Sequence, residues 1–172
     1  NTVMKGPDYI GAKTERMLIG PASYDYIDIS DSFNPAKMSG DLWEDVSLPH
    51  DYVIEGTPSR EYPQALGYLK YENAWYRKHF TLDEGDRNKR ITLYFEGVAT
   101  NATIYLNGCL MKHNFCGYTP FEVDITDIAF FDKENVLSVY TDCSTHEGWR
   151  YQGGGIYRHV WLVKTAPVAV DL

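Results

Sequence analysis

Arg90 to Gly108 reads Arg-Ile-Thr-Leu-Tyr-Phe-Glu-Gly-Val-Ala-Thr-Asn-Ala-Thr-Ile-Tyr-Leu-Asn-Gly. Apolar side chains recur at every second position in both halves, at Ile91, Leu93 and Phe95 and then at Ala102, Ile104 and Leu106. A period of two is typical of a strand with one buried face. The stretch ends on Asn107-Gly108, the dipeptide most typical of a two-residue β-hairpin. We therefore predict two antiparallel strands here.

The same pattern continues on both sides of this stretch. Further strands are predicted at residues 75–82, 121–125, 136–140, 156–163 and 168–170, and a charged turn at 83–88. Helical periodicity is absent over any useful length, although residues 127–131 allow one turn. Many short strands joined by Gly, Asn, Asp and Pro turns predict an all-β fold, an antiparallel jelly-roll β-sandwich. Trp75 and Phe95 are expected in its core.

The first forty residues differ from the rest of the chain. Gly, Pro, Ser and Asp are scattered through them, and only Met17–Ile19 and Tyr26–Ile29 suggest short strands. We predict an irregular N-terminal arm over residues 1–40 that packs on a single jelly-roll domain over residues 41–172. Thr57–Leu69, rich in Pro, Ser and Gly, is predicted to be a loop.

Charge and hydropathy exclude several classes of partner. The formal net charge of −8 argues against nucleic acid, which requires a basic face. No apolar run is long enough to predict a membrane span. The chain starts at Asn1 without a leader, which fits either a removed signal peptide or a piece of a longer protein. We expect a periplasmic or secreted protein, with the cytoplasm as the alternative.

The three cysteines, Cys109, Cys116 and Cys143, fit no metal-binding spacing. A bridge between Cys109 and Cys116 is one interpretation, and free, partly buried thiols are the other. Asp124 and Asp127 suggest either the cap of a turn or a calcium ligand, and the cap is favoured. We expect no metal and no cofactor.

Motifs of catalysis are also missing. The sequence has no Gly-x-Ser-x-Gly elbow, and Gly153-Gly154-Gly155 precedes a predicted strand rather than the helix that a dinucleotide site requires. His50 and His113 are interpreted as structural residues. From its own chemistry, this chain binds or supports and does not catalyse.

The loop at Gly148–Gly155 is the strongest candidate for binding. Glycines here adjoin Trp149, Arg150 and Tyr151, side chains that stack on sugars and hydrogen-bond to them. One interpretation is a surface that presents these side chains on a rigid sheet. The other is a wide turn whose aromatic side chains pack back onto the core.

Motifs in a fixed order connect the chain with a known family. They are Leu48-Pro49-His50-Asp51-Tyr52, Ala74-Trp75-Tyr76-Arg77-Lys78-His79-Phe80, Tyr94-Phe95-Glu96-Gly97-Val98, Ala102–Gly108, His113, Gly117-Tyr118-Thr119-Pro120-Phe121, Asp124-Ile125-Thr126, Glu134-Asn135-Val136-Leu137 and Gly155–Leu162. Together, from about Asp41 to Val163, they resemble the N-terminal sugar-binding domain of family 2 glycoside hydrolases, the β-galactosidase and β-glucuronidase group.

The resemblance implies a galactose-binding-domain-like jelly roll placed before an immunoglobulin-like domain and a (β/α)8 barrel. Two glutamates on that barrel, outside this chain, would be the acid/base and the nucleophile acting on a β-linked glycoside. No catalytic residue is therefore assigned to this chain. Arg158, on the last long predicted strand, would need Glu96 or Asp124 as a partner if buried.

The resemblance also selects candidate site residues. The family's first domain often lends an acidic residue to the sugar subsite, six positions before the glycine that opens the last long strand. Trp149 occupies that position here, and the common Arg-Trp-Tyr order is replaced by Trp149-Arg150-Tyr151. We expect these three residues to face the sugar or the barrel, with Asp51 and Tyr52 as second candidates.

Three hypotheses follow. The first is the non-catalytic N-terminal domain of a β-galactosidase-like enzyme. The second is a free-standing carbohydrate-binding module. The third is a domain that only supports the barrel and oligomer contacts and binds no sugar.

Overall fold

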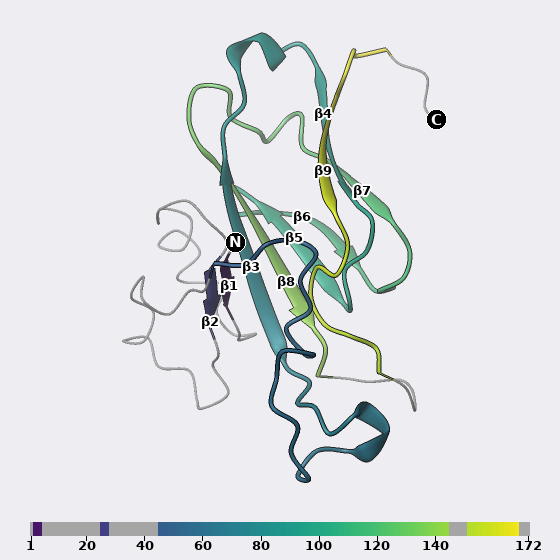
Figure 1. The fold of residues 1–172 in the computed structure, drawn as a ribbon. Helices are drawn as coiled ribbons and strands as arrows, with labels where there is room; N and C mark the ends of the chain where they lie inside the picture. Colours follow the sequence, from purple (N-terminus) through teal and green to yellow (C-terminus); the bar gives the residue numbers. More distant parts are fainter. Residues whose placement is uncertain (1, 5–24, 28–44, 145–150, 169–172) are drawn as a thin grey trace.

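A computed structural model describes residues 2–4, 25–27, 45–144 and 151–168. In these residues two β-sheets face each other and enclose one hydrophobic core (Figure 1). Within the described residues, every regular element is a strand apart from two short 3-10 turns, η4 (Gln64–Leu66) and η5 (Glu84–Asp86). This confirms the all-β sandwich.

The larger sheet has the strand order β2-β1-β3-β8-β5-β6. Its strands are β1 (Thr2–Met4), β2 (Asp25–Ile27), β3 (Asn73–Phe80), β8 (Asn135–Asp142), β5 (Ala102–Leu106) and β6 (Cys109–Asn114). All neighbours are antiparallel except β1 and β2, which are parallel. Two short pieces of the predicted arm thus extend the sheet beyond β3. The strand expected at Met17–Ile19 and the boundary at residue 40 lie outside the described residues.

The smaller sheet has the order β7-β4-β9, with β7 (Phe121–Asp124), β4 (Arg90–Phe95) and β9 (Val160–Thr165). In β4 the alternation predicted from the sequence places Ile91, Leu93 and Phe95 inside. Phe95 stacks on Phe121 of the neighbouring strand, with ring centroids 4.8 Å apart. Burial of aromatic pairs of this kind is a major source of stability in a sandwich core.

The predicted hairpin between β5 and β6 is present. Asn107 and Gly108 both have positive φ values, 51° and 82°, as a primed two-residue turn requires. The side chain of Asn107 also binds Asn135 and the backbone of Val136, and thereby joins the hairpin to the start of β8. The buried Asn135 in turn holds Phe130 by both of its backbone groups. This dipeptide therefore fixes both a turn and a loop.

The last long strand is shorter than predicted. Residues 156–159 are not in a strand, and β9 begins at Val160. Arg158 is exposed and bonds only weakly to the carbonyl of Glu96, at 3.4 Å, so the buried ion pair considered for it does not form. Val168 lies in a bend rather than in a strand, and the following residues are outside the described part.

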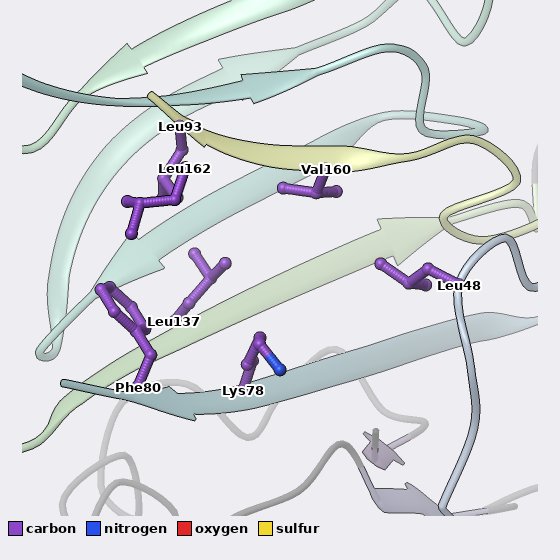
Figure 2. A pocket seen from close by; sticks show the side chains of 7 residues that line it. All are labelled: Leu48, Lys78, Phe80, Leu93, Leu137, Val160 and Leu162. Atoms are coloured by element: carbon purple, nitrogen blue, oxygen red, sulfur yellow. The ribbon is translucent and has the colours of Figure 1, made fainter. Parts of the chain in front are cut away.

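A pocket of about 270 Å³ opens between the two sheets beside β9. Figure 2 shows its apolar lining, with Leu93, Val160 and Leu162 from the smaller sheet and Phe80, Lys78 and Leu137 from the larger sheet. Leu48 closes one end. Leu48 is also the first residue of the segment that carries the candidate site.

Candidate functional site

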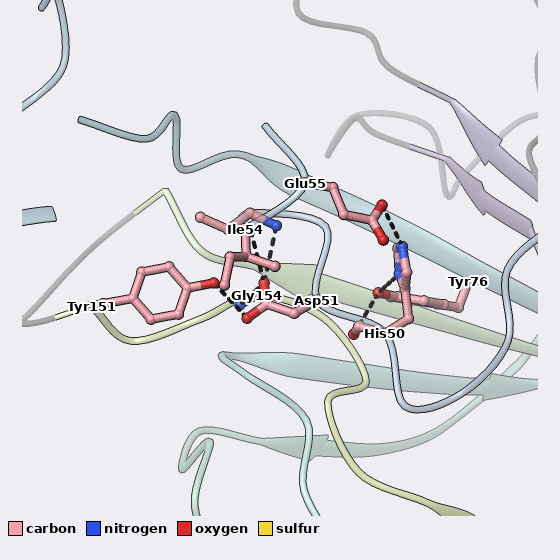
Figure 3. Close-up of polar contacts among 8 residues, drawn as sticks. His50, Asp51, Ile54, Glu55, Tyr76, Tyr151 and Gly154 are labelled. Atoms are coloured by element: carbon pink, nitrogen blue, oxygen red, sulfur yellow. Dashed lines mark hydrogen bonds and ion pairs between the residues drawn. The ribbon is translucent and has the colours of Figure 1, made fainter. Parts of the chain in front are cut away.

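Two loops that are a hundred residues apart in sequence meet at one side of the sandwich. The first contains His50, Asp51 and Tyr52, and the second contains Tyr151 and Gly153–Gly155. Figure 3 shows the Asp51 carboxylate bonded to both Tyr151 and Gly154 of the second loop. The structure thus brings together Asp51 and Tyr151, two of the residues that the sequence selected.

Asp51 accepts hydrogen bonds from both loops. Its Oδ1 accepts from the backbone N–H groups of Val53 and Gly154, each at 3.0 Å. Its Oδ2 accepts from the Tyr151 hydroxyl at 2.5 Å. We call these contacts the Asp51 clasp. Because both carboxylate oxygens are bonded within the chain, the clasp fixes the two loops relative to each other.

The glycine run is explained by close packing. Gly155 has a φ of +99°, and a Cβ atom there would overlap the Tyr76 hydroxyl. A Cβ atom on Gly154 would overlap the side chain of Val53. These positions therefore require glycine for steric reasons. In the described part of the loop, Gly153–Gly155 are buried against the core, whereas Tyr151 stays exposed, so the packing of aromatic side chains expected in the second interpretation is not seen for Tyr151.

His50 is a buried structural residue, as predicted. Its Nδ1 lies 2.8 Å from the Tyr76 hydroxyl and its Nε2 lies 3.0 Å from Glu55. Its backbone N–H donates to the carbonyl of Ile156 at 2.9 Å. Burial raises the pKa of Tyr76 well above its ordinary value, so this phenol stays protonated. The contact between His50 and Tyr76 is a buried connection beneath the clasp.

Tyr52 does not face outward. Its side chain is buried, and its hydroxyl donates to the Glu72 carbonyl at 2.7 Å. Burial raises the pKa of this phenol well above its ordinary value, and the neighbouring Cys143 adds to the effect. In this structure Tyr52 is a core residue, in contrast to the expectation that it faces a sugar or another domain. Its ring packs against Gly154 and Gly155, because a Cβ atom added to either glycine would lie 3.0 Å from a ring carbon of Tyr52.

Tyr151 is the candidate that remains at the surface, with 39% of its area exposed. Its ring contacts Tyr71 edge-on at 6.2 Å, and the Tyr71 hydroxyl accepts from the backbone N–H of Gln152 at 3.2 Å. Desolvation and the Asp51 carboxylate together raise the pKa of Tyr151. Trp149 and Arg150 lie outside the described residues. Tyr71, which no sequence motif pointed to, is part of this site.

Other predicted sites have structural roles. The Asp124 carboxylate accepts from the N–H and the hydroxyl of Thr126, which is the turn cap that the sequence favoured. Among the described residues, no group of three or more His, Cys, Asp or Glu side chains could hold a metal ion. All three cysteines are free, with Cys109 and Cys116 exposed and Cys143 buried.

Comparison with known proteins gives a consistent result. Residues 30–162 match the family described as glycosyl hydrolase 2 galactose-binding domain-like. The chain is 40% identical over 131 residues to the β-galactosidase BoGH2A of Bacteroides ovatus, covering 74% of this chain and 15% of that protein. It is 32% identical over 151 residues to a β-glucuronidase of Formosa agariphila, covering 76% of this chain and 15% of that protein.

Solved structures agree. A β-glycosidase from Bacteroides vulgatus superposes with a TM-score of 0.72 at 30% identity, over 87% of this chain and 20% of that one. The chain spans only about a sixth of the length of the curated relatives that it matches. For two β-galactosidases the matched share of the relative's length is 15% and 17%. In the described part of the chain, no helix has the length and apolar character needed to cross a membrane.

Proposed function

The chain belongs to the galactose-binding-like N-terminal domain family of the family 2 glycosyl hydrolases, and from this we propose that it is the non-catalytic N-terminal domain of a longer β-glycosidase of the β-galactosidase type. One observation carries the proposal. Relatives that match most of this chain are several times longer, and their names describe them as β-galactosidases and β-glucuronidases. The substrate of the whole enzyme would then be a β-linked glycoside.

The Asp51 clasp supports a specific role for the loop at residues 148–155. The clasp fixes Tyr151 at the surface, and Trp149 and Arg150 adjoin Tyr151 in the sequence. A loop with a fixed base can hold side chains against a neighbouring domain with little loss of conformational entropy. We propose that Trp149, Arg150 and Tyr151 face the catalytic barrel of the longer enzyme, beyond an immunoglobulin-like domain. Asp51 contributes to that face by positioning Tyr151.

The first test is hydrolysis by the chain alone. We expect no turnover of nitrophenyl β-galactoside or nitrophenyl β-glucuronide, because both catalytic glutamates would lie on another domain. Turnover that copurifies with the folded chain would contradict the proposal. The adjoining coding sequence gives an independent check, since it should encode a barrel with two suitably placed glutamates.

The second test concerns the loop in the full-length enzyme. Replacement of Trp149 by alanine should raise KM for the glycoside, because the loop would contribute to the mouth of the active site. The matched control is Phe115→Ala, an exposed aromatic residue on another loop that belongs to neither proposed site. Equal KM values for the Trp149 variant and the parent enzyme would remove the loop from the proposed site.

A further inference from the structure

Three segments outside the clasp meet at one end of the smaller sheet. Glu96 directly follows β4, Gly117-Tyr118 lies between β6 and β7, and residues 157–161 lead into β9. We call the side chains of Glu96, Tyr118, Tyr157, Arg158, His159 and Trp161 the aromatic surface. It shares no residue with the Asp51 clasp.

Glu96 holds Trp161 in place. Its Oε1 accepts a hydrogen bond from the indole Nε1–H of Trp161 at 2.9 Å. Its Oε2 accepts from the backbone N–H of His159 at 3.3 Å and lies 3.2 Å from Nδ1 of the same residue. The rings of His159 and Trp161 are 5.7 Å apart and tilted by 37°. One carboxylate thus orients an indole and an imidazole.

A second set of contacts orders the other half of the surface. The Tyr157 hydroxyl donates to the carbonyl of Gly117 at 2.7 Å and joins the two loops. The Arg158 guanidinium lies 5.3 Å from the centre of the Tyr157 ring, within the range of a cation–π contact. A Cβ atom on Gly97 would come within 3.2 Å of both side chains, so the glycine makes room for them. Hydrogen bonds thus orient Trp161, His159 and Tyr157, and Gly97 leaves room for Tyr157 and Arg158.

Aromatic side chains of this surface nevertheless remain open to solvent. Trp161 is 52% exposed and Tyr118 is 63% exposed, although proteins usually bury such side chains. Exposed large apolar groups that are rimmed by polar ones mark interaction sites. The surface carries both signs of charge, because the Arg158 guanidinium donates to the backbone carbonyl of Glu96 at 3.4 Å and Glu96 itself carries a carboxylate. A ligand with large net charge would gain little from such a surface.

We propose that the aromatic surface binds a neutral pyranose unit of an oligosaccharide, at a site separate from the clasp. The apolar face of the sugar ring stacks on the indole of Trp161, as amphipathic ligands do on exposed aromatic residues. Its hydroxyl groups hydrogen-bond to the Arg158 guanidinium and to the Glu96 carboxylate, which accepts from the indole N–H at 2.9 Å. The inference is independent of the proposed role of the Trp149 loop, and each can fail alone.

The test follows the indole N–H resonance of Trp161 in the ¹⁵N-labelled chain during titration. Lactose and galactobiose serve as neutral probes, and methyl β-glucuronide as the charged one. We expect a saturable shift with a Kd on the order of 1 mM for the neutral sugars. Trp161→Ala, followed by the backbone resonances of Gly97 and Arg158, should weaken binding roughly tenfold or more. Trp161→Phe should retain most of the affinity.

Control variants distinguish sugar binding at the aromatic surface from any role of the Trp149 loop. Trp149→Ala, in the loop of the proposed function, should leave the titration unchanged. Arg158→Ala should weaken binding without changing the fold, since this side chain is exposed. The proposal is overturned if no sugar gives a saturable shift at tens of millimolar, or if Trp161→Ala binds as the parent chain does. If no sugar gives a saturable shift, the aromatic surface is instead a contact for another protein domain.

Discussion

The Asp51 clasp and the aromatic surface both depend on one carboxylate that accepts several hydrogen bonds, yet they differ in what the carboxylate organises. Asp51 bonds to backbone groups and to Tyr151, above the close packing of Gly154 and Gly155 on the core. Glu96 accepts from the backbone N–H of His159 and also contacts the side chains of His159 and Trp161, which stay open to solvent. Hydrogen bonds therefore serve the fold in the first region and a surface in the second. Substitutions in the clasp should change stability, and substitutions in the aromatic surface should leave it nearly unchanged.

The largest effect is expected at Gly155. A Gly155→Ala substitution introduces a Cβ atom that overlaps the Tyr76 hydroxyl, at a φ of +99° that alanine disfavours. Overpacking and the backbone penalty together should lower the free energy of unfolding by about 4 kcal/mol. Urea unfolding of the variant and the parent chain measures this loss. Gly85→Ala is the control, because nothing lies within 4 Å of its added Cβ. Equal losses in both variants would show that the clasp region is not specially packed.

A smaller loss is expected at Asp51. An Asp51→Ala substitution leaves the N–H of Gly154 and the hydroxyl of Tyr151 without their acceptor. Loss of hydrogen bonds to a charged group should cost about 3 kcal/mol, again measured by urea unfolding. Asp127→Ala, on an exposed turn, should change stability by less than about 0.5 kcal/mol. If Asp51→Ala were equally mild, the carboxylate would not hold the loops together.

Tyr151 tests one bond of the clasp. Tyr151→Phe removes the hydroxyl that donates to Asp51 at 2.5 Å but keeps the ring against Tyr71. The free energy of unfolding should fall by about 1 kcal/mol. In the double-mutant cycle with Asp51→Ala the two losses should not add, because both remove the same bond. Strict additivity would indicate that the bond contributes nothing to stability.

The smallest effect is a pH dependence in the aromatic surface. Hydrogen bonds from Trp161 and His159 lower the pKa of Glu96 below its ordinary 4.5. A lowered pKa means that these bonds persist above pH 4.5 and are lost as the pH falls through the lowered value. The indole N–H resonance of Trp161 should therefore move in a single step below pH 4.5, without unfolding. Glu96→Gln should abolish the step, and a step that survives this substitution would assign it to another group.

Local sequence patterns predicted the elements whose structure depends on local rules. The alternation at Ile91, Leu93 and Phe95 and the turn at Asn107-Gly108 are confirmed because period and turn chemistry are properties of neighbouring residues. The exposed position of Arg158 was not predicted. The strand pattern that starts at Ile156 does not show that pairing with β4 begins only at Val160.

The candidate site was only partly predictable for the same reason. Asp51 and Tyr151 were each selected, but their contact spans a hundred residues and exists only after both sheets have formed. Tyr52, next to Asp51, lies in a loop without periodicity, so no pattern could show that its ring points into the core. The bond between Glu96 and Trp161 likewise depends on the register of β4 and β9.

The contacts made by residues 48–52 restrict where the chain can accept an inserted or deleted residue. Leu48 lines the pocket between the sheets, His50 contacts Tyr76, and Asp51 holds the second loop. An inserted or deleted residue in this segment would shift at least one of these side chains out of place. The loop over residues 57–65 is mostly exposed and has no such set of contacts on consecutive residues. Insertions should therefore be accepted there and rejected between Leu48 and Tyr52, which makes the spacing of this motif as much a part of the fold as its residues.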